Sequence, residues 1–224
     1  MKNYYATKLN SQALYQVYET NLESIIRYLN SEILFVKSYL TNKESVLELG
    51  VGYGRIVKEL APYCKKITGI DISKDNIDLA QDYLSDYDNV ELEVMDAHEL
   101  NLSEKFDCIL CLQNGLSSMK LNSQENISKM LDLLNVNGKL FISSYSDKIW
   151  EQRLEWFQEQ TTKQLLGKID MSKTKDGVII CEDGFKATTT TIEQLREIGE
   201  TTGYEYFVVE VEQSSTFLVI TKSW

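Results

Sequence analysis

Three glycines at alternate positions, directly after a short apolar run that contains an acid, are the residues best suited to chemistry. The run is Ser45–Leu49 with Glu48 inside it, and Gly50, Gly52 and Gly54 follow. Glycine lacks the Cβ atom that would keep a bulky ligand away from the backbone. The apolar run has the length of a buried strand, and helical spacing follows the last glycine. Together they predict a nucleotide-binding crevice at the carboxyl end of a strand.

The spacing and the acid indicate which nucleotide this turn suits. A dinucleotide fingerprint places a pyrophosphate on the helix N-terminus and needs a glycine where this chain has Arg55. A carboxylate at Glu48 repels a phosphate and favours a cation. S-adenosylmethionine has no phosphate and carries an ammonium and a sulfonium, so it fits these electrostatics. A nicotinamide-dependent oxidoreductase on a similar fold is the alternative.

A second acid, Asp71, follows a second apolar run at Ile67–Ile70. It lies 21 residues after Gly50, the interval at which an acid meets a ribose in nucleotide-binding βαβ units. Its two carboxylate oxygens can accept both ribose hydroxyls, and Ile72 then lies against the adenine. The alternative is that Asp71 only caps the following helix, but Ser73 is itself a suitable cap.

With these motifs the chain resembles the class I, Rossmann-like S-adenosylmethionine-dependent methyltransferases, over about residues 40–145 and, more loosely, over the C-terminal strand pair. The resemblance implies that the glycine turn holds the methionine part of the cofactor and Asp71 the ribose. It also implies that Asp96 accepts a hydrogen bond from the adenine amino group, with the Ala97 N–H at a ring nitrogen and Met95 packed on the ring.

The end of the fourth predicted strand, at 106–112, faces the methyl donor by the same resemblance. The predicted cofactor-binding residues are Glu48, Gly50, Gly52, Gly54, Asp71, Ile72, Met95, Asp96, Ala97, Leu112 and Gln113. The predicted substrate-binding residues are Tyr15, Tyr18 and Asn114.

No catalytic residue is predicted. Methyl transfer from a sulfonium is an in-line displacement, so orientation and exclusion of water can supply much of the rate. His98 is interpreted as a wall of the adenine pocket or a solvated loop residue rather than a catalyst. Residues 113–116, Gln-Asn-Gly-Leu, replace the Asn-Pro-Pro-Tyr type of sequence found in many enzymes that methylate amino groups of nucleic acids or protein amides. We therefore expect a small-molecule acceptor; a non-catalytic cofactor-binding protein is a further alternative.

The charge and the hydropathy of the chain also indicate which partners and which location to expect. The 224 residues carry 34 acids and 23 bases, a net charge of −11, which argues against nucleic acid or anionic lipid as a partner. The N-terminus lacks an apolar leader segment, and no stretch has the length of a membrane helix. We expect a cytoplasmic protein, either a monomer or a homodimer.

The four cysteines include Cys108 and Cys111, which form a CxxC pair. On a strand, residues three apart point to opposite faces, so their thiols diverge. We therefore predict no metal site, and interpret the cysteines as apolar filling.

Strands that alternate with helices predict an α/β fold with a parallel sheet. The resemblance implies that this is a doubly wound, mostly parallel seven-stranded sheet whose last strand is antiparallel. The expected strands are 46–49, 67–70, 90–95, 106–112, 139–144, 206–211 and 216–221. The expected helices are 55–63, 73–85, 123–134, 147–166 and 191–202. Residues 135–138 are expected to form a turn, and Thr190 with Glu193 a capping box.

Two further segments are expected beside this core. Residues 1–41, with Tyr4 and Tyr5 near their start, are predicted to form a helical lid broken near residues 30–31. Residues 146–189 are predicted to form a helix and an antiparallel β flap over the substrate site, or alternatively an edge extension or a dimer contact. The cofactor-binding domain is then 42–145 with 190–224.

Overall fold

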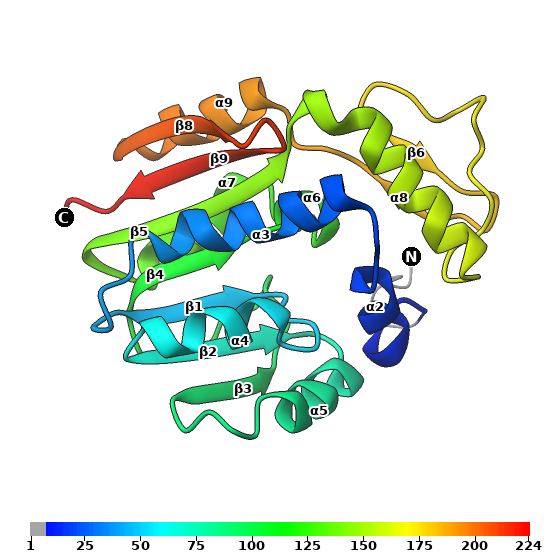
Figure 1. Ribbon diagram of the computed structural model, residues 1–224. Helices are drawn as coiled ribbons and strands as arrows, with labels where there is room; N and C mark the ends of the chain where they lie inside the picture. Colours follow the sequence, from blue (N-terminus) through cyan, green and yellow to red (C-terminus); the bar gives the residue numbers. More distant parts are fainter. Residues whose placement is uncertain (1–7) are drawn as a thin grey trace.

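A seven-stranded sheet forms the centre of the protein, for which a computed structural model describes residues 8–224 (Figure 1). The strands lie in the order β3-β2-β1-β4-β5-β9-β8. Their bounds are Ser45–Leu49 (β1), Lys66–Asp71 (β2), Val90–Val94 (β3), Phe106–Cys111 (β4), Leu134–Tyr145 (β5), Glu205–Val211 (β8) and Ser215–Thr221 (β9). The five neighbouring strands β3, β2, β1, β4 and β5 are parallel to one another, and β9 is antiparallel to both of its neighbours, β5 and β8. The predicted fold class is confirmed.

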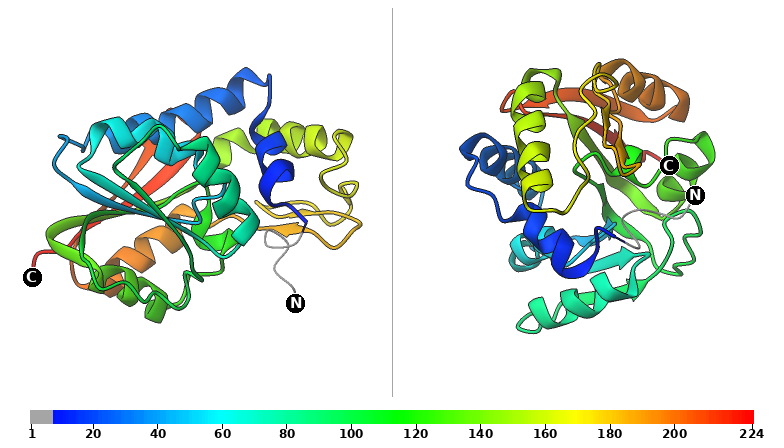
Figure 2. Two further views of the ribbon diagram at one scale, coloured as in Figure 1. Left: turned by 90° about the horizontal axis from the view of Figure 1, so that it is seen from below. Right: turned by 90° about the vertical axis from the view of Figure 1, so that its right-hand side faces the viewer.

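Helices cover both faces of the sheet (Figure 2). One face carries α3 (Glu23–Lys37), α4 (Arg55–Leu60) and α5 (Lys74–Tyr83). The other carries α6 (Gly115–Ser118), α7 (Gln124–Asp132) and α9 (Ile192–Thr202). Adjacent strand residues point to opposite faces, so the buried Val46 packs in the first core cluster and Leu47 in the second.

A third core cluster lies beyond the carboxyl ends of the parallel strands (Figure 1). It joins α2 (Ser11–Tyr18), the first half of α3, α8 (Trp150–Thr162) and the small strands β6 (Ile179–Ile180) and β7 (Lys186–Ala187). The Trp156 indole N–H donates to the Val17 carbonyl over 3.1 Å. The inserted segment therefore packs against the N-terminal helices.

Several predicted boundaries were wrong. The N-terminal helices separate between Tyr18 and Glu23, and α3 continues through residues 30–31, because the buried Ser31 hydroxyl donates to the Tyr28 carbonyl inside the helix. The capping box is formed by Thr191 and Gln194. Residues 135–138 belong to β5, where a bulge shifts the register against β4.

The remaining differences are smaller. The flap strands are only two residues long, and isolated bridges continue the pairing at Ile169–Cys181 and Lys175–Val178. Tyr4 and Tyr5 lie outside the described residues. Within residues 8–224, the structure has no helix that is both long and apolar enough to cross a membrane.

Candidate functional site

The glycine turn leads from the carboxyl end of β1 into α4 and is hydrogen-bonded to the carboxyl end of β2. Gly50, Gly52 and Gly54 have φ angles of +75°, +56° and +93°, a conformation that L side chains rarely adopt. The Gly50 N–H donates to the Ile70 carbonyl over 2.9 Å. A Cβ at Gly54 would come within 2.6 Å of the Leu84 side chain. Close packing against α5 and backbone conformation thus both require glycine here.

Asp71 closes this turn with hydrogen bonds to its backbone. Its carboxylate accepts from the Gly52 N–H at 3.0 Å, the Ser73 N–H at 2.8 Å and the Asn76 amide at 3.1 Å. Ser73 is the residue that caps α5, because its hydroxyl accepts from the Asn76 N–H. Burial raises the pKa of Asp71 and these hydrogen bonds oppose the rise. The beginning of α5 does not depend on Asp71 as its cap.

Residues after β3 meet the same edge of the sheet. The Met95 N–H donates to the Asp71 carbonyl over 3.0 Å, and Ala97 is buried. Asp96 accepts from the backbone N–H and from ring Nδ1 of His98, at 2.9 and 2.8 Å. Burial raises the pKa of Asp96, but the His98 hydrogen bonds outweigh it, so the pKa lies below its ordinary value.

An exposed apolar residue comes directly after Asp71 in the sequence. This residue, Ile72, is 42% exposed, an unusual state for a large hydrophobic residue at the end of a buried strand. The predicted ribose and adenine residues are therefore brought together around the ends of β1, β2 and β3, with an apolar surface beside them.

Glu48 is almost completely enclosed inside β1. It is 3% exposed, and its Oε2 atom has no hydrogen-bond partner among the described residues. Burial raises its pKa to about 8, the Arg55 guanidinium lowers it, and Asp71 raises it. The sequence suggests a standing negative charge at this position, whereas the structure holds a carboxyl group that is mostly protonated at neutral pH. It becomes charged when a cation lies beside it.

The segment after β4 holds Leu112, Gln113 and Asn114. Leu112 is buried, and Gln113 and Asn114 have φ angles of +52° and +59°. The buried Nε2 atom of Gln113 has no hydrogen-bond partner in the described part of the chain. The Asn114 amide, by contrast, donates to the Thr188 carbonyl over 2.6 Å and accepts from the Ser144 hydroxyl over 3.1 Å. Asn114 therefore connects β4 to the inserted segment, and Gln113 is the residue with unused polar capacity.

Sequence reasoning missed Glu32 of α3. It is fully buried, and its Oε2 atom accepts from the Gln113 backbone N–H over 3.1 Å. A signal was present: Glu32 lies four residues after Tyr28 and seven after Ile25, both buried, so all three share one helical face. The incorrect break at 30–31 removed Glu32 from that face. Arg55, at the start of α4, was also missed as a half-buried cation, and its buried Nη2 atom has no hydrogen-bond partner within 8–224.

Helix α2 lies over the glycine turn. The Leu14 side chain comes within 2.9 Å of where a Cβ on Gly52 would be. The rings of Tyr15 and Tyr18 lie 5.0 and 6.0 Å from the Tyr53 ring within the turn. The Arg55 guanidinium lies 5.0 Å from the Tyr18 ring. Both predicted substrate tyrosines therefore reach the crevice from α2.

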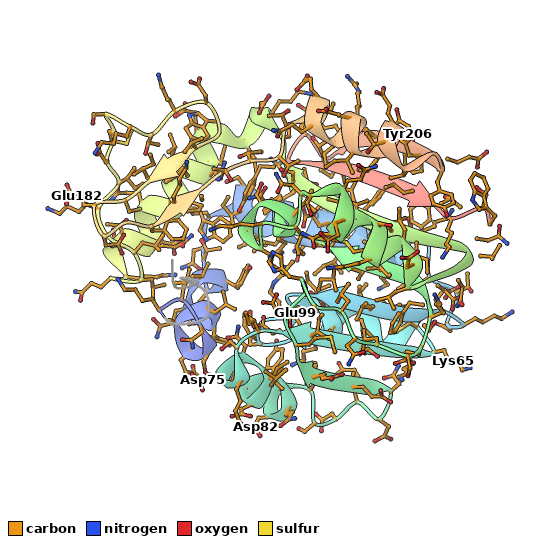
Figure 3. The ribbon with its side chains drawn as sticks, turned by 180° about the vertical axis from the view of Figure 1, so that it is seen from behind. Lys65, Asp75, Asp82, Glu99, Glu182 and Tyr206 are labelled. Carbon is orange, nitrogen blue, oxygen red and sulfur yellow. The ribbon has the colours of Figure 1, made fainter. Side chains whose placement is uncertain are left out.

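Hydrogen bonds attach α2 to the start of α5. The Ser11 N–H donates to Asn76 Oδ1 over 2.5 Å, and the Asn10 amide donates to Asp75 over 3.2 Å. Asn76 also donates to Asp71, so α2 is coupled to the group predicted to hold the ribose. Figure 3 places Asp75 on this side of the molecule and Lys65 on the opposite side, where β2 begins.

Two open hollows lie away from the crevice. One, of about 540 Å³, is formed by the end of α8 and residues 166–168 with Asp183. The other, of about 450 Å³, lies at the amino ends of the strands, around Val136 and Lys139. Ligands of open α/β sheets bind at the carboxyl ends of strands where the strand order reverses, here between β1 and β4. Their position and their unpartnered polar groups both favour the glycine turn and the neighbouring strand ends over these hollows as the ligand site.

The cysteines are buried and free. Burial raises the pKa of Cys108 and of Cys111 to about 12, so both remain thiols. Residues 8–224 bring together no group of three His, Cys, Asp or Glu side chains that could hold a metal ion.

Comparisons with known proteins agree with this geometry. A family model described as a methyltransferase domain matches residues 46–138. An uncharacterized methyltransferase of Schizosaccharomyces pombe is 33% identical over 110 residues, which cover 44% of this chain and 38% of that protein. A probable ribosomal RNA small subunit methyltransferase A of Methanococcus maripaludis is 38% identical over 134 residues, covering 60% and 44%. The chain thus spans less than half the length of these curated relatives.

Solved structures share the whole fold. The PH0226 protein of Pyrococcus horikoshii superposes with a TM-score of 0.65 at 20% identity, covering 99% of each chain. Magnesium protoporphyrin IX methyltransferase of Synechocystis, solved with bound S-adenosylhomocysteine (SAH), gives a TM-score of 0.64 at 15% identity, covering 97% of each chain. At these identities the likeness concerns the fold.

Proposed function

We propose that this chain, whose residues 46–138 match a methyltransferase domain and whose sheet has the class I, Rossmann-like fold, transfers a methyl group from S-adenosylmethionine to a small-molecule acceptor. The observation that carries the proposal is the group of residues gathered at the reversal point between β1 and β4. There a glycine turn with positive φ angles adjoins buried polar atoms that lack partners among residues 8–224.

The residues present fit this donor. On the side of β2 and β3, Asp71 and Asp96 offer carboxylate oxygens beside the exposed Ile72, which suits a ribose and an adenine. On the side of β1 and β4, Glu48 offers an unpartnered oxygen and Gln113 an unpartnered amide, which suit an ammonium and a carboxylate. An empty buried acceptor or donor costs stability, so a ligand that satisfies both groups gains affinity.

Each of these residues then has a task in the reaction. When bound, S-adenosylmethionine supplies a methyl group activated by its sulfonium. Glu48 and Gln113 orient the methionine end, Asp71 fixes the ribose, and the glycine turn allows close approach. Helix α2, acting as a lid through Leu14, Tyr15 and Tyr18, excludes water. The predicted insertion at 146–189 bounds the acceptor. Asn114 holds this insertion in place through its hydrogen bond to Thr188 and does not itself contact the substrate.

The net charge of the protein supports a small-molecule acceptor. The net charge of −11 disfavours the phosphate backbone of a nucleic acid. A ribosomal RNA acceptor is the second candidate, because one relative that is 38% identical has that name.

Incubating the protein with S-adenosylmethionine labelled in its methyl group tests the proposal. We expect label to enter compounds of a small-molecule metabolite extract and not ribosomal RNA added at equal mass. Label in RNA alone would support the second candidate. Absence of transfer despite measured cofactor binding would indicate a non-catalytic binding protein.

A further inference from the structure

Glu32 is a buried carboxyl group to which the cofactor assignment gives no role. Its Oε2 atom is held by the Gln113 backbone N–H, two residues past β4, whereas Oε1 has no hydrogen-bond partner in the described chain. Glu32 therefore presents a free acceptor atom at the carboxyl end of β4, next to the point where the strand order reverses. A buried, unsatisfied carboxyl oxygen is costly unless a ligand uses it.

One aromatic residue, Tyr28, lies beside this carboxyl group, and a second, Tyr145, packs on Tyr28. The hydroxyl of Tyr28, one turn earlier on α3, is buried and lies close enough to the Glu32 carboxyl group to lower its pKa. The Tyr28 ring lies 5.2 Å from that of Tyr145 at the end of β5. A carboxylate beside aromatic rings is a favourable environment for an organic cation. Arg153 lies over the Tyr145 ring at 4.2 Å, and its Nη1 atom donates to the Gly177 carbonyl over 3.0 Å, which anchors this wall to the inserted segment.

We propose that Glu32 binds the nitrogen of an amine acceptor and takes its proton, which makes the protein an N-methyltransferase. The inference rests on the proposed function. The Glu32 carboxylate accepts one proton from the bound ammonium and leaves a neutral amine. The nitrogen lone pair forms the new C–N bond while the C–S bond of the donor breaks, and that electron pair stays on sulfur. Glu32 returns its proton to solvent after product release.

Other acceptor classes fit Glu32 less well. A carboxylate acceptor would place a second negative charge against that of Glu32. An alcohol is a much weaker acid than an ammonium and needs a stronger base than a carboxylate. The net charge of −11 also draws cations to the protein.

Several groups set the protonation of Glu32. Burial raises its pKa to about 7, whereas the Ser143 hydroxyl, the Gln113 N–H, the Arg55 guanidinium and the Tyr28 hydroxyl lower it. Tyr145 and Arg153 act on Tyr28 in turn. A base whose pKa lies near neutral pH is effective under ordinary conditions.

The Glu32→Gln variant tests this role. Glutamine keeps an oxygen for the Gln113 N–H but cannot take a proton. With the amine identified from the labelled extract, we expect kcat/KM to fall roughly 100- to 10,000-fold. We also expect the variant to recover activity at high pH, where the amine is already neutral. Glu23→Gln, which removes an exposed carboxylate from the first turn of the same helix, is the control and should match the wild type.

A second measurement does not depend on turnover. Calorimetry of the amine binding to the SAH-loaded protein at pH 7, in two buffers of different ionisation enthalpy, counts the protons released. The bound ammonium lowers the pKa of Glu32, so we expect proton release from the wild type and from Glu23→Gln but not from Glu32→Gln. The affinity of all three for SAH should agree.

Two results would overturn the inference while leaving the proposed function intact. One is an O-methyl ether, a methyl ester or a methylated RNA as the labelled product. The other is a Glu32→Gln variant with wild-type kcat/KM and wild-type proton release. If the wild type binds no S-adenosylmethionine, the proposed function itself fails and the inference fails with it.

Discussion

The two sides of the crevice are built differently. On the proposed nucleotide side, at the ends of β1 to β3, the side-chain hydrogen bonds of Asp71 and Asp96 join residues at most 19 positions apart in the sequence, such as Asp71 with Ser73 and Asp96 with His98. On the acceptor side, at the end of β4, they join residues 81 and 74 positions apart, Glu32 with Gln113 and Asn114 with Thr188. Local motifs thus build the first side, and tertiary packing builds the second.

This difference implies a division of labour. The proposed cofactor-binding side, whose carboxylates are held by residues of the same sequence region, should depend on distant segments mainly through the hydrogen bonds of α2 to Asn76 and Asp75. An acceptor side assembled from α3, β4 and the inserted segment can change its specificity without disturbing the cofactor. Glu48 of β1 lies between the two sides. Because it is buried, replacing it should have the largest effect of all the substitutions on the free energy of unfolding.

Replacing Glu48 by Gln should change how stability depends on pH. The folded-state pKa of Glu48, about 8, is raised above the ordinary value of 4.5, so its protonated form stabilises the fold. That contribution is fully present below about pH 4.5 and is lost as the pH rises toward about 8. The unfolding free energy of Glu48→Gln relative to wild type should therefore increase by about 1.4 kcal/mol per pH unit across this window.

Urea unfolding of both proteins between pH 5 and 8 measures this difference. Glu44→Gln is the matched control, since Glu44 is exposed just before β1 and its pKa is lowered. The difference between this control and wild type should stay constant over the same range. A constant difference for Glu48→Gln as well would show that Glu48 is not desolvated.

Replacing Asn114 by Ala should affect the acceptor side alone. The change leaves the Thr188 carbonyl without its donor and the Ser144 hydroxyl without its acceptor, at a cost of about 2 kcal/mol in the free energy of unfolding. Cofactor affinity should stay within about twofold of wild type, because the nucleotide side does not use this amide. Calorimetry that finds a large loss of cofactor affinity would mean that the two sides are coupled.

Replacing Asp71 by Ala should have the opposite pattern. We expect S-adenosylmethionine affinity to fall by at least about 1.5 kcal/mol, because two ribose hydroxyls lose their acceptor. Asp78→Ala, which removes an exposed carboxylate paired with Lys74 on α5, is the control and should bind normally. Unchanged affinity in Asp71→Ala would contradict the ribose assignment.

The same contrast explains what could be predicted from the sequence. The strands, the sheet and the glycine turn were predictable, because hydrophobic periodicity and glycine conformation act over a few residues. Glu32 was not predicted, because its role depends on contacts with β4 and its neighbours Asn30 and Ser31 suggested a helix end. The protonation of Glu48 was also mistaken, since burial, and not residue type, decides it.

Calorimetric titration of the wild type with S-adenosylmethionine at pH 7 tests the central claim, that the crevice takes a positively charged adenosyl compound without phosphate. The account predicts saturable binding with proton release, because the bound ammonium lowers the pKa of Glu48, and little or no binding of NADH. Tight NADH binding, or no response to S-adenosylmethionine at millimolar concentration, would contradict it.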